Sequence, residues 1–95
     1  MSKLIPEENF KDKLASLKGW QIIDGELAKA FDFPDFISAL RFVNAIGRVA
    51  EFMDHHPDIL LSYGKVEVLT TTHSQKGLTD KDFELARAID GIRPD

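Results

Sequence analysis

Cysteine is absent from the 95 residues of this chain. Its absence excludes disulfides, thiolate nucleophiles, iron–sulfur clusters and cysteine-type zinc sites together. Basic residues are also few: 12 Lys and Arg stand against 16 Asp and Glu, and they form no stripe of the kind that binds a phosphate backbone. We therefore expect no direct nucleic-acid binding. Any chemistry must come from histidine, carboxylates, tyrosine, tryptophan or the backbone.

Long apolar stretches are lacking as well. The opening MSKLIPEENF has neither the apolar segment of a signal peptide nor a lipidation motif, and no later run approaches membrane-spanning length. With 43% apolar and 29% charged residues, the composition is typical of a soluble globular protein. We expect a cytoplasmic protein without membrane contact, folded as one domain over residues 1–95.

Apolar periodicity, turn residues and caps divide the chain into five segments. They predict a helix over 6–19, a β-hairpin over 20–33, a helix over 35–54, a second hairpin over 58–72 and a helix over 79–91. Short hairpins imply antiparallel neighbours. The expected fold is therefore α+β, in the order helix–strand–strand–helix–strand–strand–helix, with a four-stranded antiparallel sheet and its helices packed on one face.

The helix over 35–54 is apolar on two sides. The row expected to face the core is Phe36, Leu40, Val43, Gly47 and Ala50. About 100 to 140° around the helix lies a second row, Phe42, Ala45, Val49 and Phe52. A helix this apolar is either buried on two sides within one subunit or shared between subunits. We favour the shared helix and expect a homo-oligomer.

The last helix carries clear start and stop signals. Thr79 and Asp82 have the spacing of a capping box, Leu78 and Phe83 form the matching hydrophobic staple, and Gly91 closes the helix. This capping role is sufficient by itself to explain Asp82.

The three histidines of the chain all fall at ends of predicted elements. His55 and His56 follow the long helix, where Pro57 disfavours the α conformation and is expected to fix the helix end, and His73 ends the run VEVLTTTH. One interpretation is structural, since a histidine in a last helical turn interacts with free carbonyls and the helix dipole. The other is a site, because sites are usually built at element ends and a free imidazole gives and takes protons near neutrality.

Neighbouring residues allow similar alternatives. Glu51 lies one turn before His55, where its carboxylate can accept a hydrogen bond from that imidazole, or it is an exposed edge beside Arg48. Trp20 is either a core residue or a flat platform for a ligand. Asp54 and the histidines are also metal-ligand types, but adjacent histidines lack the spacing of a helical metal motif. We expect no metal.

Taken together, these residues resemble a known family. The linked motif consists of Glu51, His55-His56-Pro57, Tyr63, His73 and Asp82, within the blocks FDFPDFISALRFVNAIGRVAE and THSQKGLTDKDFELARAID. From Trp20 to Asp90 the chain resembles the pterin-4a-carbinolamine dehydratases. One departure is Gly64, where the family more often has asparagine. The resemblance implies dehydration of 4a-hydroxytetrahydropterin to quinonoid dihydropterin, in tetrahydrobiopterin recycling, without metal or cofactor.

The resemblance also implies roles for the site residues. His55 and His73 would be the acid/base pair, and His56 would bind and orient the pterin with some help in proton transfer. Glu51 would tune His55, and Asp82 would support the site. The residues implied at the substrate are His56, Pro57 and Trp20.

Partners follow from the same resemblance. Family members are dimers or tetramers, which agrees with the two-sided helix, and a homodimer or homotetramer is therefore expected. Two alternatives remain open. The chain could be a protein-binding dimerisation cofactor of a transcription factor, as some relatives are, or it could act on another pterin such as a molybdopterin precursor.

Overall fold

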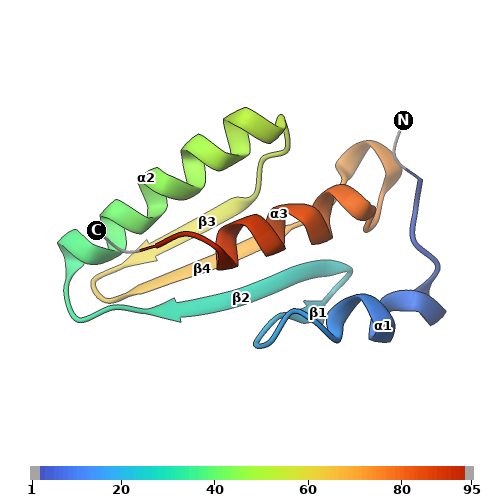
Figure 1. Cartoon of the computed structure of the whole chain (residues 1–95), viewed down its shortest axis with the longest axis horizontal. Helices are drawn as coiled ribbons and strands as arrows, with labels where there is room; N and C mark the ends of the chain where they lie inside the picture. The colour runs from blue at the N-terminus through green and yellow to red at the C-terminus, as the bar shows by residue number, and fades with distance from the viewer. Residues whose placement is uncertain (1–2, 94–95) are drawn as a thin grey trace.

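A four-stranded antiparallel sheet with helices on one face forms the protein, as the sequence predicts. The computed structural model describes residues 3–93 (Figure 1). The strands are β1 (Gln21–Ile23), β2 (Glu26–Asp32), β3 (Asp58–Ser62) and β4 (Lys65–Thr70), in the spatial order β1-β2-β4-β3. The helices are α1 (Phe10–Leu14), α2 (Phe36–Met53) and α3 (Asp80–Asp90), with short 3-10 helices η1 (Glu7–Asn9) and η2 (His73–Gln75).

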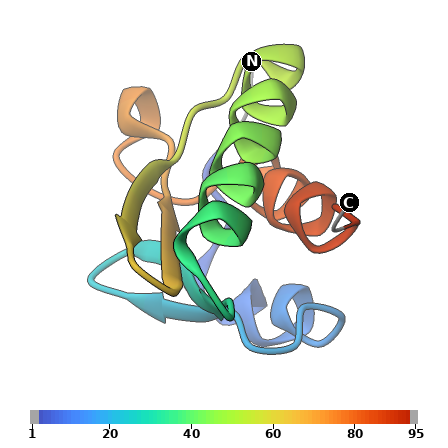
Figure 2. The same cartoon turned by 90° about the vertical axis from the view of Figure 1, so that its left-hand side faces the viewer.

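The helices and the sheet form two layers with the core between them. Figure 2 shows α2 and α3 on the same side of the sheet. The core between these layers combines side chains of the two central strands, such as Leu27 and Val66, with side chains of the helices, such as Ile46 and Phe83. Among residues 3–93, no helix combines the length and apolar character needed to cross a membrane.

The predicted first helix is shorter in the structure than its apolar spacing suggests. Instead of continuing to Gly19, α1 ends at Leu14 and two tight turns follow, with Leu17 N–H donating to Leu14 O and Trp20 N–H to Leu17 O. These turns bury Leu17 and Trp20, which are 2% and 5% exposed. Burial of these two large side chains favours the turns, because a helix this short is only marginally stable by itself.

Both predicted hairpins are confirmed. Asp24 and Gly25 have φ of 49° and 78°, the positive values that a two-residue type I′ turn requires. Gly64, in the other hairpin, is needed for a different reason. A Cβ there would lie 2.7 Å from the carbonyl oxygen of Phe33, whose N–H donates to Gly64 O. Glycine at position 64 therefore lets the two chain segments approach closely.

The start of α2 is capped by Asp35. Its carboxylate accepts a hydrogen bond of 2.8 Å from the N–H of Ser38. That backbone hydrogen bond, supported by the Ser38 side chain, lowers the pKa of Asp35 from its ordinary value.

The buried face of α2 differs from the predicted core row. The buried residues are Ala39, Ile46 and Ala50, and of these only Ala50 belongs to the row expected to face the core. Phe36, the first member of that row, is 43% exposed. The buried face lies between the two apolar rows because α2 packs on the sheet and on α3 at once. Phe52, at the end of the second row, is 91% exposed.

Candidate active site

The end of α2 is set by a left-handed residue rather than by proline. Asp54 has φ of 52°, its N–H donates to the carbonyls of Ala50 and Glu51, and the N–H of His55 donates to Ala50 O. This is a common way to end a helix. The chain therefore leaves the helix before Pro57, and the expectation that Pro57 fixes the helix end is wrong.

His55 is held by the third helix. Its Nε2 lies 2.6 Å from Oδ1 of Asp82, which is fully buried, while the His55 side chain remains 10% exposed. The expected hydrogen bond between Glu51 and His55 does not form. An i, i+4 pair requires both residues in helical conformation, and Asp54 breaks that geometry between them.

Glu51 instead binds His56. The distance from His56 Nε2 to Glu51 Oε2 is 2.5 Å, with side-chain exposures of 55% and 78%. A pair this exposed to solvent contributes little to stability, so its importance must be sought in how it orients the ring. The two adjacent histidines thus face different carboxylates, one buried and one exposed.

Asp82 is the centre of a buried hydrogen-bond network. Its Oδ1 accepts from the hydroxyl of Thr70 at 2.7 Å, and its Oδ2 accepts from the hydroxyl of Thr72 at 2.8 Å and from the N–H of Thr79 at 3.0 Å. The predicted capping box of Thr79 and Asp82 is confirmed. Asp82 therefore caps α3 and contacts His55 with the same carboxylate.

Thr70 and Thr72 are site residues that the sequence reasoning missed. A signal for Thr70 was present: Val66, Val68 and Thr70 alternate along β4 and are all buried, so a hydroxyl ends a row of core side chains. A polar group at the end of such a row needs a buried partner. No local pattern indicated that this partner is Asp82.

His73 lies on a closed loop beside this network. It begins η2 and is exposed, and it directly follows Thr72, which contacts Asp82. Backbone hydrogen bonds between Thr72 and Gly77, in both directions, close the loop at its base. Asp82 therefore contacts two segments of the chain. One carboxylate oxygen faces His55, and the other accepts from Thr72, the residue before His73.

Trp20 is not brought to the histidines. It is buried, and its indole N–H donates to both carboxylate oxygens of Asp90, 3.0 Å away. Lys29 bonds to the same carboxylate and to the carbonyl of Lys18. Asp90 and Asp82 are eight residues apart on α3, or about 12 Å along the helix. Trp20 therefore has a structural partner at the end of α3 opposite to the site.

Pro57 and Tyr63 lie at opposite ends of β3. Pro57 follows His56 directly and is half-buried, which keeps it beside the histidine pair. Tyr63 follows the strand and is 71% exposed. A five-residue strand spans about 17 Å, so Tyr63 lies away from the histidines.

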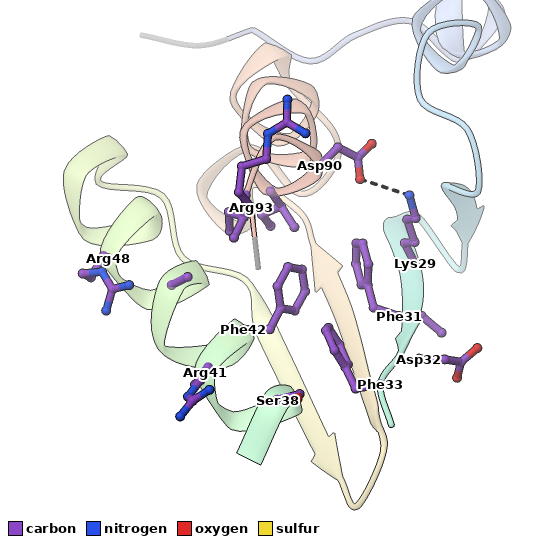
Figure 3. A pocket seen from close by; sticks show the side chains of 14 residues that line it. Lys29, Phe31, Asp32, Phe33, Ser38, Arg41, Phe42, Arg48, Asp90 and Arg93 are labelled. Carbon is purple, nitrogen blue, oxygen red and sulfur yellow. Dashed lines mark hydrogen bonds and ion pairs between the residues drawn. The ribbon is translucent and has the colours of Figure 1, made fainter. Parts of the chain in front are cut away.

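A cavity of about 650 Å³ lies between β2, α2 and the C-terminal end of α3 (Figure 3). Phe42 lies 4.8 Å from Phe31 and 5.1 Å from Phe33 between ring centroids, and the lining also includes Arg41, Arg48 and Arg93. None of the site residues predicted from the sequence lines this cavity. Arginine holds its proton at any physiological pH, so these side chains do not exchange protons. The arginines of this cavity are therefore no candidates for acid/base catalysis.

Comparisons with known proteins agree on one family. The family model described as pterin 4 alpha carbinolamine dehydratase matches residues 3–92. A Metallosphaera sedula protein with the provisional name pterin-4-alpha-carbinolamine dehydratase is 46% identical over 85 residues, covering 90% of this chain and 88% of that protein.

Two solved structures are similar to this chain. The transcriptional coactivator/pterin dehydratase from Brucella melitensis is 33% identical, covers 93% of this chain and 96% of its own, and superposes with a TM-score of 0.88. A pterin dehydratase-like protein identified as a RuBisCO assembly factor in the alpha-carboxysome shares the fold, with a TM-score of 0.61 and 19% identity over 75% of this chain and 82% of its own.

Proposed function

The chain belongs to the pterin 4 alpha carbinolamine dehydratase family, and we propose that it removes water from 4a-hydroxytetrahydropterin to give quinonoid dihydropterin, in tetrahydrobiopterin recycling. The observation that supports this most directly is the pairing of a partly exposed imidazole, His55, with a fully buried carboxylate, Asp82. Such a pair orients a histidine for proton transfer.

The reaction needs two proton transfers and no other chemistry. An acid protonates the hydroxyl on C4a, which leaves as water when the C–O bond breaks. A base removes a proton from a ring nitrogen. The electron pair of the broken N–H bond stays in the ring and completes the quinonoid system. The proton gained and the proton lost balance, so two imidazoles are sufficient.

The histidines divide these tasks in our proposal. His55 and His73 are the acid/base pair: His55 contacts Asp82 directly, and His73 follows Thr72, whose hydroxyl donates to the same carboxylate. His56 binds and orients the pterin, with Pro57 beside it, and contributes to proton transfer. Glu51 orients His56. This role takes the place of the tuning of His55 that was expected of Glu51 from the sequence. Trp20, already bonded to Asp90, is not part of the proposed site.

The test is the decay of 4a-hydroxytetrahydropterin, generated enzymatically and followed by absorbance with and without the purified protein. We expect the protein to accelerate decay in proportion to its concentration. Decay at the buffer rate at every protein concentration would contradict the proposal. Replacing the biopterin side chain by other ring substituents in the same assay then tests the alternative that another pterin is the physiological substrate.

Self-association is also part of the proposal. The second apolar row of α2 ends in Phe52, whose side chain is almost fully exposed in the single chain. Large apolar side chains that are exposed in this way mark protein interfaces. Phe52→Asp is expected to shift a homodimer or homotetramer toward monomer by at least tenfold in dissociation constant, measured by sedimentation velocity. Ser16→Asp, at an exposed position after α1, is the matched control. An unchanged sedimentation coefficient in Phe52→Asp would place any interface elsewhere.

The same row of α2 is the surface for the alternative function, binding to another protein. The Brucella melitensis neighbour, described as a transcriptional coactivator/pterin dehydratase, motivates this second candidate. A pull-down from native lysate in which only this chain is recovered would count against it.

A further inference from the structure

The buried carboxylate of Asp82 is surrounded by hydrogen-bond donors on both oxygens. Oδ1 accepts from the hydroxyl of Thr70 and faces Nε2 of His55, and Oδ2 accepts from the hydroxyl of Thr72 and the N–H of Thr79. A carboxylate offers about four acceptor positions. All four positions therefore face a neighbour, and three of these neighbours are donors: the hydroxyls of Thr70 and Thr72 and the N–H of Thr79.

The hydroxyls form a directed chain. Thr79 and Thr72 are joined by a 2.7 Å hydrogen bond between hydroxyl oxygens, and the Thr79 hydroxyl accepts from the N–H of Lys81. Each hydroxyl has a single proton. Because the Thr72 proton goes to Asp82, the Thr79 hydroxyl must donate to Thr72.

The Thr70 hydroxyl also bears on the protonation of Asp82. Thr70 is 1% exposed, and Asp82 is its hydrogen-bond acceptor. If Asp82 were protonated toward Thr70, the hydroxyl proton of Thr70 would lose this acceptor in a buried position, which is costly. The shell therefore favours an ionised Asp82 with both oxygens accepting.

This arrangement determines which nitrogen of His55 carries a proton. Since Asp82 only accepts, Nε2 must be protonated, and Nδ1 is the nitrogen left for a substrate. Among the described residues, none bonds to Nδ1 and no buried side-chain nitrogen or oxygen lacks a partner, so Nδ1 must reach the surface.

We infer that Thr70 and Thr72 are positioning residues: their hydroxyls complete the donor shell of Asp82, which holds His55 in the tautomer that leaves Nδ1 as its reacting nitrogen. The inference rests on the proposed function and adds two residues and one reacting atom to it. Neither threonine touches the substrate. Each acts through Asp82.

The substitutions Thr70→Val and Thr72→Val remove one hydroxyl each and keep the branched shape. Loss of a hydrogen bond to a charged group is expected to lower kcat about tenfold, with KM nearly unchanged. Thr70→Ser and Thr72→Ser restore the hydroxyl and should restore most of the rate. Thr71→Val is the matched control, because the hydroxyl of Thr71 bonds, among residues 3–93, to the carbonyl of Gly25 alone, at 3.5 Å.

The second readout does not depend on activity. In ring ¹⁵N spectra of the wild-type protein, the neutral form of His55 should show Nε2 protonated and Nδ1 bare. The proton signal of Nε2–H should be shifted or lost by exchange in Thr70→Val and Thr72→Val, and retained in Thr71→Val and in both serine variants. A merely structural role of the threonines would leave this signal in place in any variant that remains folded, as checked by circular dichroism.

The outcomes separate the two proposals. Protonation of Nδ1 in neutral His55, or an unmoved Nε2–H signal with an unchanged rate in both valine variants, would overturn the positioning role. The expected ¹⁵N pattern in a protein that does not accelerate carbinolamine decay would support the donor shell while overturning the dehydratase function.

Discussion

Replacing His55 by alanine is expected to slow enzymatic dehydration of 4a-hydroxytetrahydropterin by roughly 10²–10⁴-fold, the usual loss when one positioned acid or base is removed. The physical reason is the geometry around this ring: Nε2 is bound to Asp82, so the imidazole is held in one orientation with its other nitrogen available to the substrate. His73→Ala should have a loss of similar size. His56→Ala should raise KM more than it lowers kcat, because we assign His56 mainly to binding.

The measurement is the initial rate of carbinolamine decay at saturating and at low substrate for each variant. Tyr63→Ala is a suitable control, since Tyr63 belongs to the family motif by sequence but lies in an exposed turn away from the histidines. Unchanged rates in all three histidine variants would rule out histidine acid/base catalysis. A loss smaller than tenfold in His55→Ala alone would show that a neighbouring histidine substitutes for it.

The Asp82→Asn variant should lose activity to a comparable extent, about 10²–10⁴-fold, although the side chain keeps its shape. An amide replaces one accepting oxygen with a donating NH₂ group in a shell where the hydroxyls of Thr70 and Thr72 and the N–H of Thr79 all donate. With the NH₂ group toward His55, Nε2 must become an acceptor and Nδ1 must carry the proton. A wrong tautomer is known to have this effect in the serine protease triad, where replacing aspartate by asparagine costs about 10⁴-fold.

The same substitution should also destabilise the protein by about 1–3 kcal/mol, because buried donors lose their acceptor and the cap of α3 is weakened. Urea unfolding measures this cost. Asp80→Asn is the matched control: Asp80 lies in the same first turn of α3 but is exposed, and its ion pair is with the exposed Lys13. Full activity and wild-type stability in Asp82→Asn would contradict the central position that we give to Asp82.

Ordinary local signals were sufficient for much of the fold. The Asp24-Gly25 turn, the Thr79–Asp82 capping box and the extent of α2 are confirmed, because each depends on residues that are close in sequence. Where a prediction depended on which face of a helix is buried, the sequence was ambiguous. Ile46 lies in the middle of the buried face of α2, between two apolar rows that both looked suitable.

In the candidate site, too, the sequence predicts some features and leaves others ambiguous. Its residue types and positions, three histidines at element ends and carboxylates nearby, follow from the sequence. The partner of each histidine does not. Glu51 was expected at His55, but a single left-handed residue, Asp54, turns His55 toward α3 and leaves His56 for Glu51.

The sequence by itself therefore determined the order of helices and strands, the family and the positions of the three histidines at element ends, since periodicity, caps and motif spacing are local properties of the chain. Only the tertiary structure decided that Asp82 is at once a helix cap and the partner of His55, that Thr70 and Thr72 complete its shell, and that Trp20 is bonded to Asp90 instead of lying at the site. These contacts join residues far apart in sequence. They exist because α2 and α3 pack on one face of the sheet, and no local pattern records that packing.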